Sequence, residues 1–516
     1  MGVTLGVVAL LLAVGSCARL PIDVHRTVST AFSQPQETRL GQMLRDELAA
    51  HPGKSGFLLL GSGLDAFVAR AVLANAADRS IDAQYYLLHN DLTGTLFIDQ
   101  LVKAADRGVR VRLLVDDMDL AGRDLGAAAL DSLPNMQVRI FNPFSRNVAR
   151  LPQFITRFGS VTRRMHNKSF TVDGQVTILG GRNIGNEYFE ADPDLAFSDL
   201  DVMAVGPVAA EVSASFDKYW NSELAYPALS LKKKPPTAGQ IQEPRRLLDE
   251  WVAKQADSDY LKALNNSTLA NAMRADEMTF YWGRADVVYD LPEKLLNEYG
   301  SKEYALSPQL APYFERVQKE LIIFSPYFVP GRAGVAFLTE LARRGVRVRI
   351  LTNSLASTDV GVVYAGYAKY RKALLRGGVE LYEMDKRFSP KGEGEQKGFF
   401  GASKASLHAK SFVFDRRQVF IGSLNLDPRA VAHNTEIGVV FENAQVAGAM
   451  SDWFDANIDQ KAFRLELIAG GKWGGQLRWH GNVNGEPVVY TAEPYVGFWR
   501  RLGIGFMGLL PIESQL

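Results

Sequence analysis

The chain has 516 residues, of which 47% are hydrophobic, and its formal net charge at neutral pH is +1. This length is enough for two hydrophobic cores of ordinary domain size, and the small net charge gives no overall attraction to nucleic acid, so no nucleic acid is expected as a partner. The single cysteine, Cys17, excludes an intrachain disulfide framework and a cysteine-based zinc site.

The first 16 residues form an apolar run that is too short to cross a bilayer as a helix and is typical of a secretory signal peptide. Residues 14–17 read VGSC and resemble a bacterial lipobox, which predicts a signal peptide over 1–16 and lipidation of Cys17. Because no Lys or Arg precedes the run, an ordinary signal peptide and a different start site remain alternatives. Export predicts a membrane-associated lipoprotein of the bacterial cell envelope that faces the periplasm.

From about residue 40 the sequence alternates between strand-like and helical patterns. Strand patterns cover residues 80–86, 108–116 and 136–141, with an amphipathic helical run at 93–105. The second half repeats this order at 321–327, 345–352 and 379–383, and both halves contain the segment GVRVR. This internal duplication predicts an α/β fold of two related lobes, each with a mixed, largely parallel sheet flanked by helices.

The most informative feature is a motif that occurs twice with the same spacing, H-x-K-x4-D-x6-G-[GS]-x-N. In a strand, residues i and i+2 lie on the same face, so the His and Lys of each copy are expected to point the same way. The Asp begins a turn, and the small residues allow a close approach of the backbone to a ligand. The members of the two copies are His166, Lys168, Asp173, Gly180, Gly181 and Asn183, and His408, Lys410, Asp415, Gly422, Ser423 and Asn425.

A single His-x-Lys is typical of an ordinary half-buried strand, but two matched copies supply two imidazoles, two ammonium groups and two amides. That set suits phosphoryl transfer, in which one neutral His attacks phosphorus and the other, protonated, gives its proton to the leaving oxygen. The Lys and Asn side chains would neutralise the oxyanions. This chemistry requires neither a metal nor a cofactor. Because each half brings one His, the two halves are expected to meet about a pseudo-twofold axis with both motifs between them.

These motifs resemble the signature of the phospholipase D superfamily. The runs RRMHNKSFTVDG, FSDLDVMAVGP and FIGSLNLDPR further resemble the bacterial cardiolipin synthase branch, in particular its type C, over most of residues 55–510. The resemblance implies that one His, usually that of the first motif, forms a phosphatidyl-histidine intermediate and that the other acts as general acid and then as base. It also implies an acid downstream of each motif that orients a histidine, and Asp199 and Glu436 stand at those positions.

The resemblance implies a catalytic set of His166, Lys168, Asp173, His408, Lys410 and Asp415, with phosphate contacts from Asn183, Asn425 and the two lysines. It implies a phosphatidyltransferase that makes cardiolipin from phosphatidylglycerol and a second phospholipid, phosphatidylethanolamine or phosphatidylglycerol, at a membrane surface. The sequence leaves two alternatives open: a phospholipase D-type phosphodiesterase, less readily a nuclease, that uses water as acceptor, and an inactive lipid-binding scaffold of the envelope. It says nothing about a helper protein.

The remaining segments complete the predicted organisation. The first lobe is expected over 17–230, a linker with a polar insert over 231–305, the second lobe over 306–450 and a C-terminal extension over 451–516. Two segments just before the motif histidines, 145–164 and 384–404, interleave basic and aromatic residues, which predicts either a rim that holds lipid headgroups or ordinary surface loops. The aromatic run 495–510 predicts either an interfacial helix or packing on the catalytic body.

Overall fold

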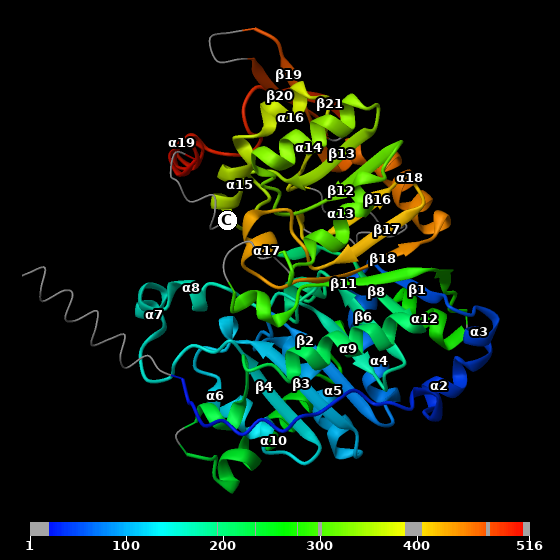
Figure 1. Ribbon diagram of the computed structural model, residues 1–516, viewed down its shortest axis with the longest axis vertical. Coiled ribbons are helices and arrows are strands. Elements are labelled where there is room, and N and C mark those ends of the chain that lie inside the picture. Colours follow the sequence, from blue (N-terminus) through cyan, green and yellow to red (C-terminus); the bar gives the residue numbers. More distant parts are fainter. Residues whose placement is uncertain are drawn as a thin grey trace, which may run out of the picture.

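The computed structural model describes residues 20–192, 195–232, 234–275, 277–297, 302–387, 405–470, 475–483 and 485–508. Two α/β lobes lie one above the other (Figure 1), the first in blue to green and the second in green to red. Cys17 and the predicted signal peptide lie outside the described residues, as does most of the basic segment 384–404.

The first lobe is built on a nine-stranded sheet in which only the pairs β2–β3 and β3–β4 are parallel. Helices α4 (Gly63–Ala76) and α5 (Leu92–Asp106) cover one face, and α9 (Pro207–Trp220) covers the other. In spatial order the strands are β10 (Tyr281–Gly283), β1 (Ser55–Leu60), β8 (Asp201–Val205), β6 (Val176–Gly180), β5 (Ser169–Val172), β2 (Ser80–Tyr85), β3 (Arg110–Asp116), β4 (Met136–Phe141) and β9 (Ala225–Pro227).

The second lobe repeats this plan in a ten-stranded sheet. The helices that correspond to α5 and α9 are α14 (Gly331–Arg343) and α18 (Ala444–Lys461). In spatial order the strands are β11 (Ala285–Tyr289), β18 (Ile437–Glu442), β17 (Gln418–Gly422), β16 (Ser411–Phe414), β12 (Glu320–Phe324), β13 (Arg347–Asn353), β14 (Glu380–Met384), β19 (Ala462–Ile468), β20 (Gln476–Val483) and β21 (Glu486–Tyr490).

The strand orders confirm the internal duplication. The order β1-β8-β6-β5-β2-β3-β4 of the first sheet corresponds, strand by strand, to β11-β18-β17-β16-β12-β13-β14 of the second. The predicted mixed sheets are therefore present, but the expectation that they are largely parallel is wrong. Each motif forms an antiparallel hairpin, β5–β6 or β16–β17, and the next strand is again antiparallel. Within each of the two large sheets, parallel pairing is therefore confined to three strands joined by helical crossovers.

The two lobes share one hydrophobic core and therefore form a single unit. Buried side chains of β6 and β8 pack with those of β16, β17 and β18 in one cluster, and the rings of Phe57 and Phe441 stack across the boundary at 4.1 Å between centroids. Burial of apolar area on this scale is the main force that holds protein lobes together. The seam between the lobes is thus fixed by packing, and the ends of the two motif hairpins lie at that seam.

The predicted boundaries differ from the observed elements in two places. Within the expected insert 231–305, helices α10 (Ala238–Gln255), α11 (Asp259–Asn265) and α12 (Thr268–Ala275) pack on α4, α5 and α6 (Asp124–Asp131) of the first lobe. The expected boundary at residue 450 falls inside α18, and β19 to β21 extend the second sheet rather than forming a separate extension. Of the described helices, none has the length and apolar character needed to span a bilayer.

Candidate active site

The two motif hairpins have the turns that the sequence predicted. The backbone has positive φ angles at Asp173 and Gly174, and likewise at Asp415 and Arg416, where both central residues adopt the left-handed conformation of a tight hairpin turn. Each histidine and lysine lies just before the first strand of its hairpin, at the opposite end from the turn. The turns therefore hold the hairpins in register while the histidine ends converge on the seam between the lobes.

Residues of the second lobe hold His166 in place. Its backbone N–H donates to the carbonyl of Thr435 at 2.8 Å, and its ring Nδ1 lies 2.8 Å from Oε2 of Glu436. The hydroxyl of Ser423 donates to the same carboxylate at 2.5 Å. Because Nδ1 is held by Glu436, the lone pair of Nε2 is left to react.

Residues of the first lobe hold His408 in place in the same way. Its backbone N–H donates to the carbonyl of Ser198 at 2.8 Å, and Nδ1 lies 2.6 Å from Oδ2 of Asp199. A short parallel bridge between β15 (Ala405–Leu407) and β7 (Ala196–Ser198) fixes this approach. The acid downstream of each motif therefore orients the histidine of the other motif, so neither half holds a complete site alone.

The two lysines lie beside the histidines of their own motifs. The ammonium group of Lys168 donates to the carbonyl of His166 at 2.6 Å, and that of Lys410 donates to the carbonyl of His408 at 2.5 Å. Lys410 Nζ also lies 3.0 Å from Nδ1 and 3.2 Å from Nε2 of the His408 ring. All four side chains are buried, so the amino groups of two lysines adjoin two imidazoles, and burial also lowers the pKa of Lys168 well below its ordinary value.

This environment depresses the pKa of the basic groups. Burial, and then the charges of Lys168 and Lys410, hold the pKa of His166 well below its ordinary value. Burial and the charge of Lys410 likewise lower the pKa of His408, although Asp199 opposes this effect. Burial also lowers the pKa of Lys410 to about 8. These shifts favour the neutral form of both imidazoles when no substrate is present, and the negative charge of a bound phosphate would favour protonation of one of them.

The two orienting carboxylates differ from each other. Burial raises the pKa of Glu436 well above its ordinary value, with Lys168 opposing the shift. Burial also disfavours ionisation of Asp199, but the charge of His408 and the hydrogen bond from its ring outweigh that effect and lower the pKa of Asp199. The ionised Asp199 stabilises the protonated form of His408, whereas the neutral form is more strongly favoured for His166.

The motif amides are not equivalent. Asn183 donates from Nδ2 to the hydroxyl of Tyr188 at 2.9 Å and accepts from the N–H of Leu87 at 3.2 Å, so its amide is engaged within the first lobe. Asn425 is buried, and within the described part of the chain its Oδ1 has no hydrogen-bond partner. Asn425 therefore has more unused hydrogen-bonding capacity for a ligand than Asn183.

The structure does not bring Asp173 and Asp415 to the histidines, which corrects their placement in the catalytic set. The carboxylate of Asp173 accepts backbone N–H groups from residues 78, 79 and 80 at 2.7–2.9 Å. Asp415 accepts those of residues 318, 319 and 320 at 2.7–3.2 Å. Each Asp thus ties its hairpin turn to the start of the neighbouring strand, and the role that follows is structural.

Several residues near the histidines have no motif to mark them. The ring of Tyr86 meets that of His166 edge-on at 5.0 Å, and Phe197 lies over His408 at 5.0 Å. The N–H of Glu436 donates to Oδ2 of Asp290 at 2.8 Å, which fixes the acid that holds His166. These contacts join residues far apart in the sequence, which gives no signal for them.

The glycine at position 181, where the second motif has Ser423, has a steric cause. A Cβ at 181 would lie 2.1 Å from the carboxylate of Asp199, so no side chain fits there. In the second lobe the corresponding serine instead donates to Glu436.

Of the basic residues in segment 145–164, Arg146 and Arg164 do not contribute to a rim for lipid headgroups. Arg164 is buried and pairs with Asp116 at 2.9 Å, and Arg146 pairs with Asp117 and Asp124. These arginines neutralise buried carboxylates at the ends of strands and are not presented to a lipid surface. The part of the second rim segment over residues 388–404 lies outside the described residues.

The described residues contain no group of three or more His, Cys, Asp or Glu side chains that could hold a metal ion. What the site does contain is two imidazoles, each held at Nδ1 by a buried carboxylate, together with two ammonium groups. This arrangement supports attack on phosphorus by one ring and proton transfer by the other.

The two-lobed α/β fold and the duplicated His-Lys-Asp motif define a protein of the phospholipase D superfamily. The family described as "Cardiolipin synthase, PLD-like domain" matches residues 70–220 and 310–458. The chain therefore belongs to the cardiolipin synthase family, which confirms the resemblance seen in the sequence.

Individual relatives support the same assignment. Cardiolipin synthase C of Escherichia coli (strain K12) is 40% identical over 479 residues, which cover 93% of this chain and 100% of that protein. Cardiolipin synthase A of Pseudomonas syringae pv. syringae (strain B728a) is 27% identical, with 78% of this chain and 68% of that protein covered. The crystal structure of phosphatidylserine synthase from Haemophilus influenzae Rd KW20 has a similar fold, with a TM-score of 0.53 at 15% identity. The superposition covers 82% of this chain and 91% of the synthase chain.

Proposed function

We propose that this protein is a phosphatidyltransferase that makes cardiolipin by moving a phosphatidyl group from one phospholipid to a hydroxyl of phosphatidylglycerol. The observation that carries the proposal is the pair of buried histidines at the seam, each held at Nδ1 by a carboxylate of the opposite lobe. Full-length similarity to a cardiolipin synthase supports the choice of reaction.

In the first half-reaction, Nε2 of His166 attacks the phosphorus of the donor lipid. An N–P bond forms and the P–O bond to the headgroup alcohol breaks, while His408 gives its proton to the departing oxygen. The strongly depressed pKa of His166 supports its role as nucleophile, because a neutral ring is available. Ionised Asp199 supports the role of His408 as proton donor, because it stabilises the imidazolium that forms when substrate binds.

In the second half-reaction, His408 is neutral and accepts the proton of a phosphatidylglycerol hydroxyl. The oxygen of that hydroxyl attacks phosphorus, the N–P bond breaks, and His166 leaves as a neutral imidazole. Lys168 and Lys410 stabilise the charge on the equatorial phosphate oxygens in both steps, because their ammonium groups are buried beside the rings. Ethanolamine or glycerol is released, depending on whether phosphatidylethanolamine or phosphatidylglycerol is the donor.

Lipid analysis tests the reaction directly. Purified full-length protein mixed with vesicles of isotopically labelled phosphatidylglycerol, with and without phosphatidylethanolamine, is expected to yield cardiolipin that carries the label. Mass spectrometry of the extracted lipids is the measurement. Phosphatidic acid as the main product would identify a hydrolase, and unchanged lipids would identify a binding scaffold, so either result contradicts the proposal.

The crossed pairing of acids and histidines predicts different defects in two matched variants. Glu436→Gln is expected to slow the first half-reaction by about 10²- to 10⁴-fold, because an amide no longer fixes the His166 tautomer with Nε2 free. Asp199→Asn acts on His408 instead. With phosphatidyl-p-nitrophenol, whose leaving group needs no proton, this variant is expected to form the covalent adduct at nearly the normal rate.

Mass spectrometry of the protein after single-turnover mixing reports the adduct in both variants. A block of adduct formation in Asp199→Asn, with Glu436→Gln unaffected, would reverse the assignment of the two histidines.

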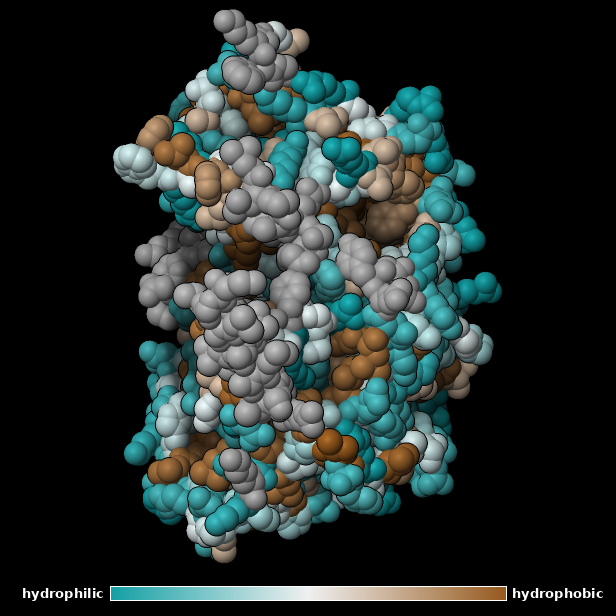
Figure 2. Space-filling view, turned by 60° about the vertical axis from the view of Figure 1, so that its left-hand side comes forward, coloured by the Kyte–Doolittle hydropathy of each residue, from teal (hydrophilic) through white to brown (hydrophobic). Residues whose placement is uncertain are grey.

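We also propose that the protein works at the surface of the cell envelope membrane, with a lipidated Cys17 and helix α19 (Phe498–Met507) as its contacts. In α19 the side chains of Phe498, Trp499, Leu502 and Phe506 are 54–79% exposed, while Ile504 is buried against the second lobe. Such a helix suits the interface between headgroups and acyl chains. Figure 2 turns this side of the molecule forward and shows hydrophobic side chains in brown mixed with hydrophilic ones in teal over the visible surface.

The double substitution Trp499→Ser/Phe506→Ser is expected to weaken binding of the unlipidated protein to phosphatidylglycerol vesicles by about tenfold or more, since each factor of ten needs only about 1.4 kcal/mol. Vesicle co-sedimentation is the measurement. Val489→Ser is the control, because Val489 is 53% exposed on β21 and outside α19.

In cells, Cys17→Ala is expected to release the processed protein from the membrane fraction; retention at the usual processed size would argue against lipidation.

A further inference from the structure

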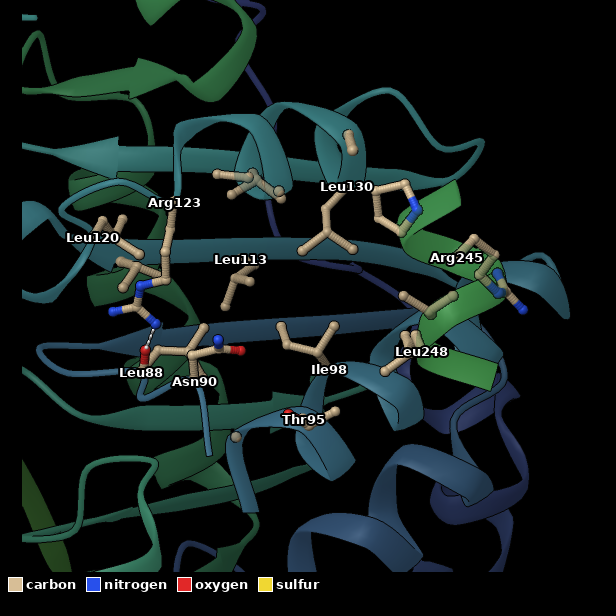
Figure 3. A pocket seen from close by; sticks show the side chains of 18 of the residues that line it. Leu88, Asn90, Thr95, Ile98, Leu113, Leu120, Arg123, Leu130, Arg245 and Leu248 are labelled. Atoms are coloured by element: carbon tan, nitrogen blue, oxygen red, sulfur yellow. Dashed lines mark hydrogen bonds between the residues drawn. The ribbon is translucent and has the colours of Figure 1, made fainter. Parts of the chain in front are cut away.

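A large apolar cavity lies inside the first lobe, away from the two histidines. Its volume is about 810 Å³, and Figure 3 shows it from close by. The floor is the face of β3 and β4, with Leu113, Val115 and Ile140 among its side chains. Helices α5 and α6 form the walls, from which Ile98 and Leu130 point into the space.

Helix α10 of the polar insert packs on α5 and α6 and lines one end of this cavity. Its apolar residues Ile241, Leu248 and Trp251 line the space, although most of the helix is polar. Arg245 ties α10 to the end of α5 through a pair with Asp106 at 2.6 Å. The insert whose purpose the sequence did not indicate therefore completes one end of an apolar chamber.

The two ends of the cavity lie at opposite ends of the sheet. Arg245, beside the last residue of α5, marks the end near the start of β3. At the other end, Leu88 and Asn90 follow β2, and Arg123 donates to the carbonyl of Leu88 at 2.5 Å. Along α5 the lining residues run from Leu92 to Val102, which is about 15 Å at the rise of an α-helix.

The polar end of the cavity is connected by the chain itself to the catalytic residues. Tyr86 touches the ring of His166, and the next residue donates its N–H to Oδ1 of Asn183. The third residue along, Leu88, lines the cavity and is bridged to Ile184. The three residues 86–88 thus join the side of the His166 ring to the lining of the chamber.

We propose that this cavity holds an acyl chain of a phospholipid substrate while its phosphate lies between the histidines; this inference rests on the proposed function. A chamber of this volume is of the size that binds small hydrophobic ligands, and between its polar ends the mostly apolar lining gives few partners to water. The hydrocarbon core of a bilayer is about 30 Å thick, so one lipid tail occupies about 15 Å, which fits the length of the lined face.

The occupant is an acyl chain joined to a headgroup rather than a free fatty acid, because the cavity's polar end faces the catalytic region. His89, at that end, is held between Asp119 and Glu187 at 2.7 and 3.0 Å, and these carboxylates leave no net positive charge to attract a fatty-acid carboxylate. Their hydrogen bonds, followed by burial that opposes them, raise the pKa of His89 to about 10.

The first test measures binding, without turnover. The probe is a lysophosphatidylglycerol whose acyl chain ends in pyrene, titrated into the full-length protein and followed by fluorescence. Leu130→Trp fills the chamber and is expected to weaken binding tenfold or more. Leu296→Trp makes the same exchange at a residue that is 50% exposed outside the cavity, and is expected to stay within twofold of the original protein. Ile98→Trp replaces Leu130→Trp if thermal unfolding shows that the latter does not fold.

Equal affinities of the original protein and a folded cavity-filling variant would overturn the proposal. Displacement of the probe by palmitate as effectively as by unlabelled lysophosphatidylglycerol would also overturn it, because the chamber would then bind free fatty acids.

The second test compares turnover of dihexanoyl and dioleoyl phosphatidylglycerol. Leu130→Trp is expected to lower kcat/KM for the dioleoyl lipid tenfold or more and to leave the dihexanoyl lipid within twofold, since short chains do not need the chamber. An equal fall for both lipids would contradict an acyl-chain site. If the original protein turned over neither lipid, the proposed function would fail while the binding test still decided this inference.

Discussion

His166→Asn is expected to lower cardiolipin formation by about three orders of magnitude or more and to abolish the phosphatidyl-enzyme adduct. The reason is that Nε2 of His166 is the atom that bonds to phosphorus, and the neighbouring lysines cannot replace it because they point to backbone carbonyls. Loss of a covalent nucleophile removes a step of the reaction and not merely a favourable contact. Mass spectrometry of the protein and of the lipids measures both effects.

His408→Asn is the informative partner of this variant. With phosphatidyl-p-nitrophenol the adduct is expected to form at His166 and then to accumulate, because no base remains to activate the acceptor hydroxyl. His480→Asn serves as the control, since His480 also pairs with a carboxylate, Glu466 at 2.6 Å, but lies on β20 far along the second sheet. Adduct formation in His166→Asn, or near-normal transfer in either motif variant, would contradict the mechanism.

The sequence predicted the main parts of the fold because its signals are local. Strand patterns in each half correspond to β2, β3 and β4 and to β12, β13 and β14, and the motif spacing predicted the two hairpins with their turns. A spacing repeated within one chain also predicted that the two halves combine. These features depend on alternation of side chains and on turn residues, both of which act over a few residues.

What the sequence could not predict depends on contacts between distant residues. Glu436 orients His166 and Asp199 orients His408 because one lobe packs on the other. Each acid lies closer in sequence to the other histidine, so the sequence did not indicate this crossed pairing. The chamber that α10 helps to line was equally hidden, because a mostly polar helix gives no sign that its apolar side chains line a cavity. Arg164 reads as a surface charge in sequence but is buried against Asp116.

Asp173 shows that a repeated motif spacing does not by itself establish a role in the chemistry. Its substitution has the largest expected effect on the stability of the protein. Its buried carboxylate accepts three backbone N–H groups, so Asp173→Ala would leave three donors without partners inside the protein. We expect the free energy of unfolding to fall by about 3–5 kcal/mol. Chemical denaturation followed by circular dichroism is the measurement.

Asp415→Ala is the matched control within the same molecule, because Asp415 makes the same contacts in the second lobe but is only half-buried. Water can replace its carboxylate, so the expected loss is about 1–2 kcal/mol. Protein that remains folded after either substitution is expected to keep its rate of adduct formation, since neither carboxylate contacts a histidine. A variant that is as stable as the original protein but inactive would show instead that this Asp takes part in the chemistry.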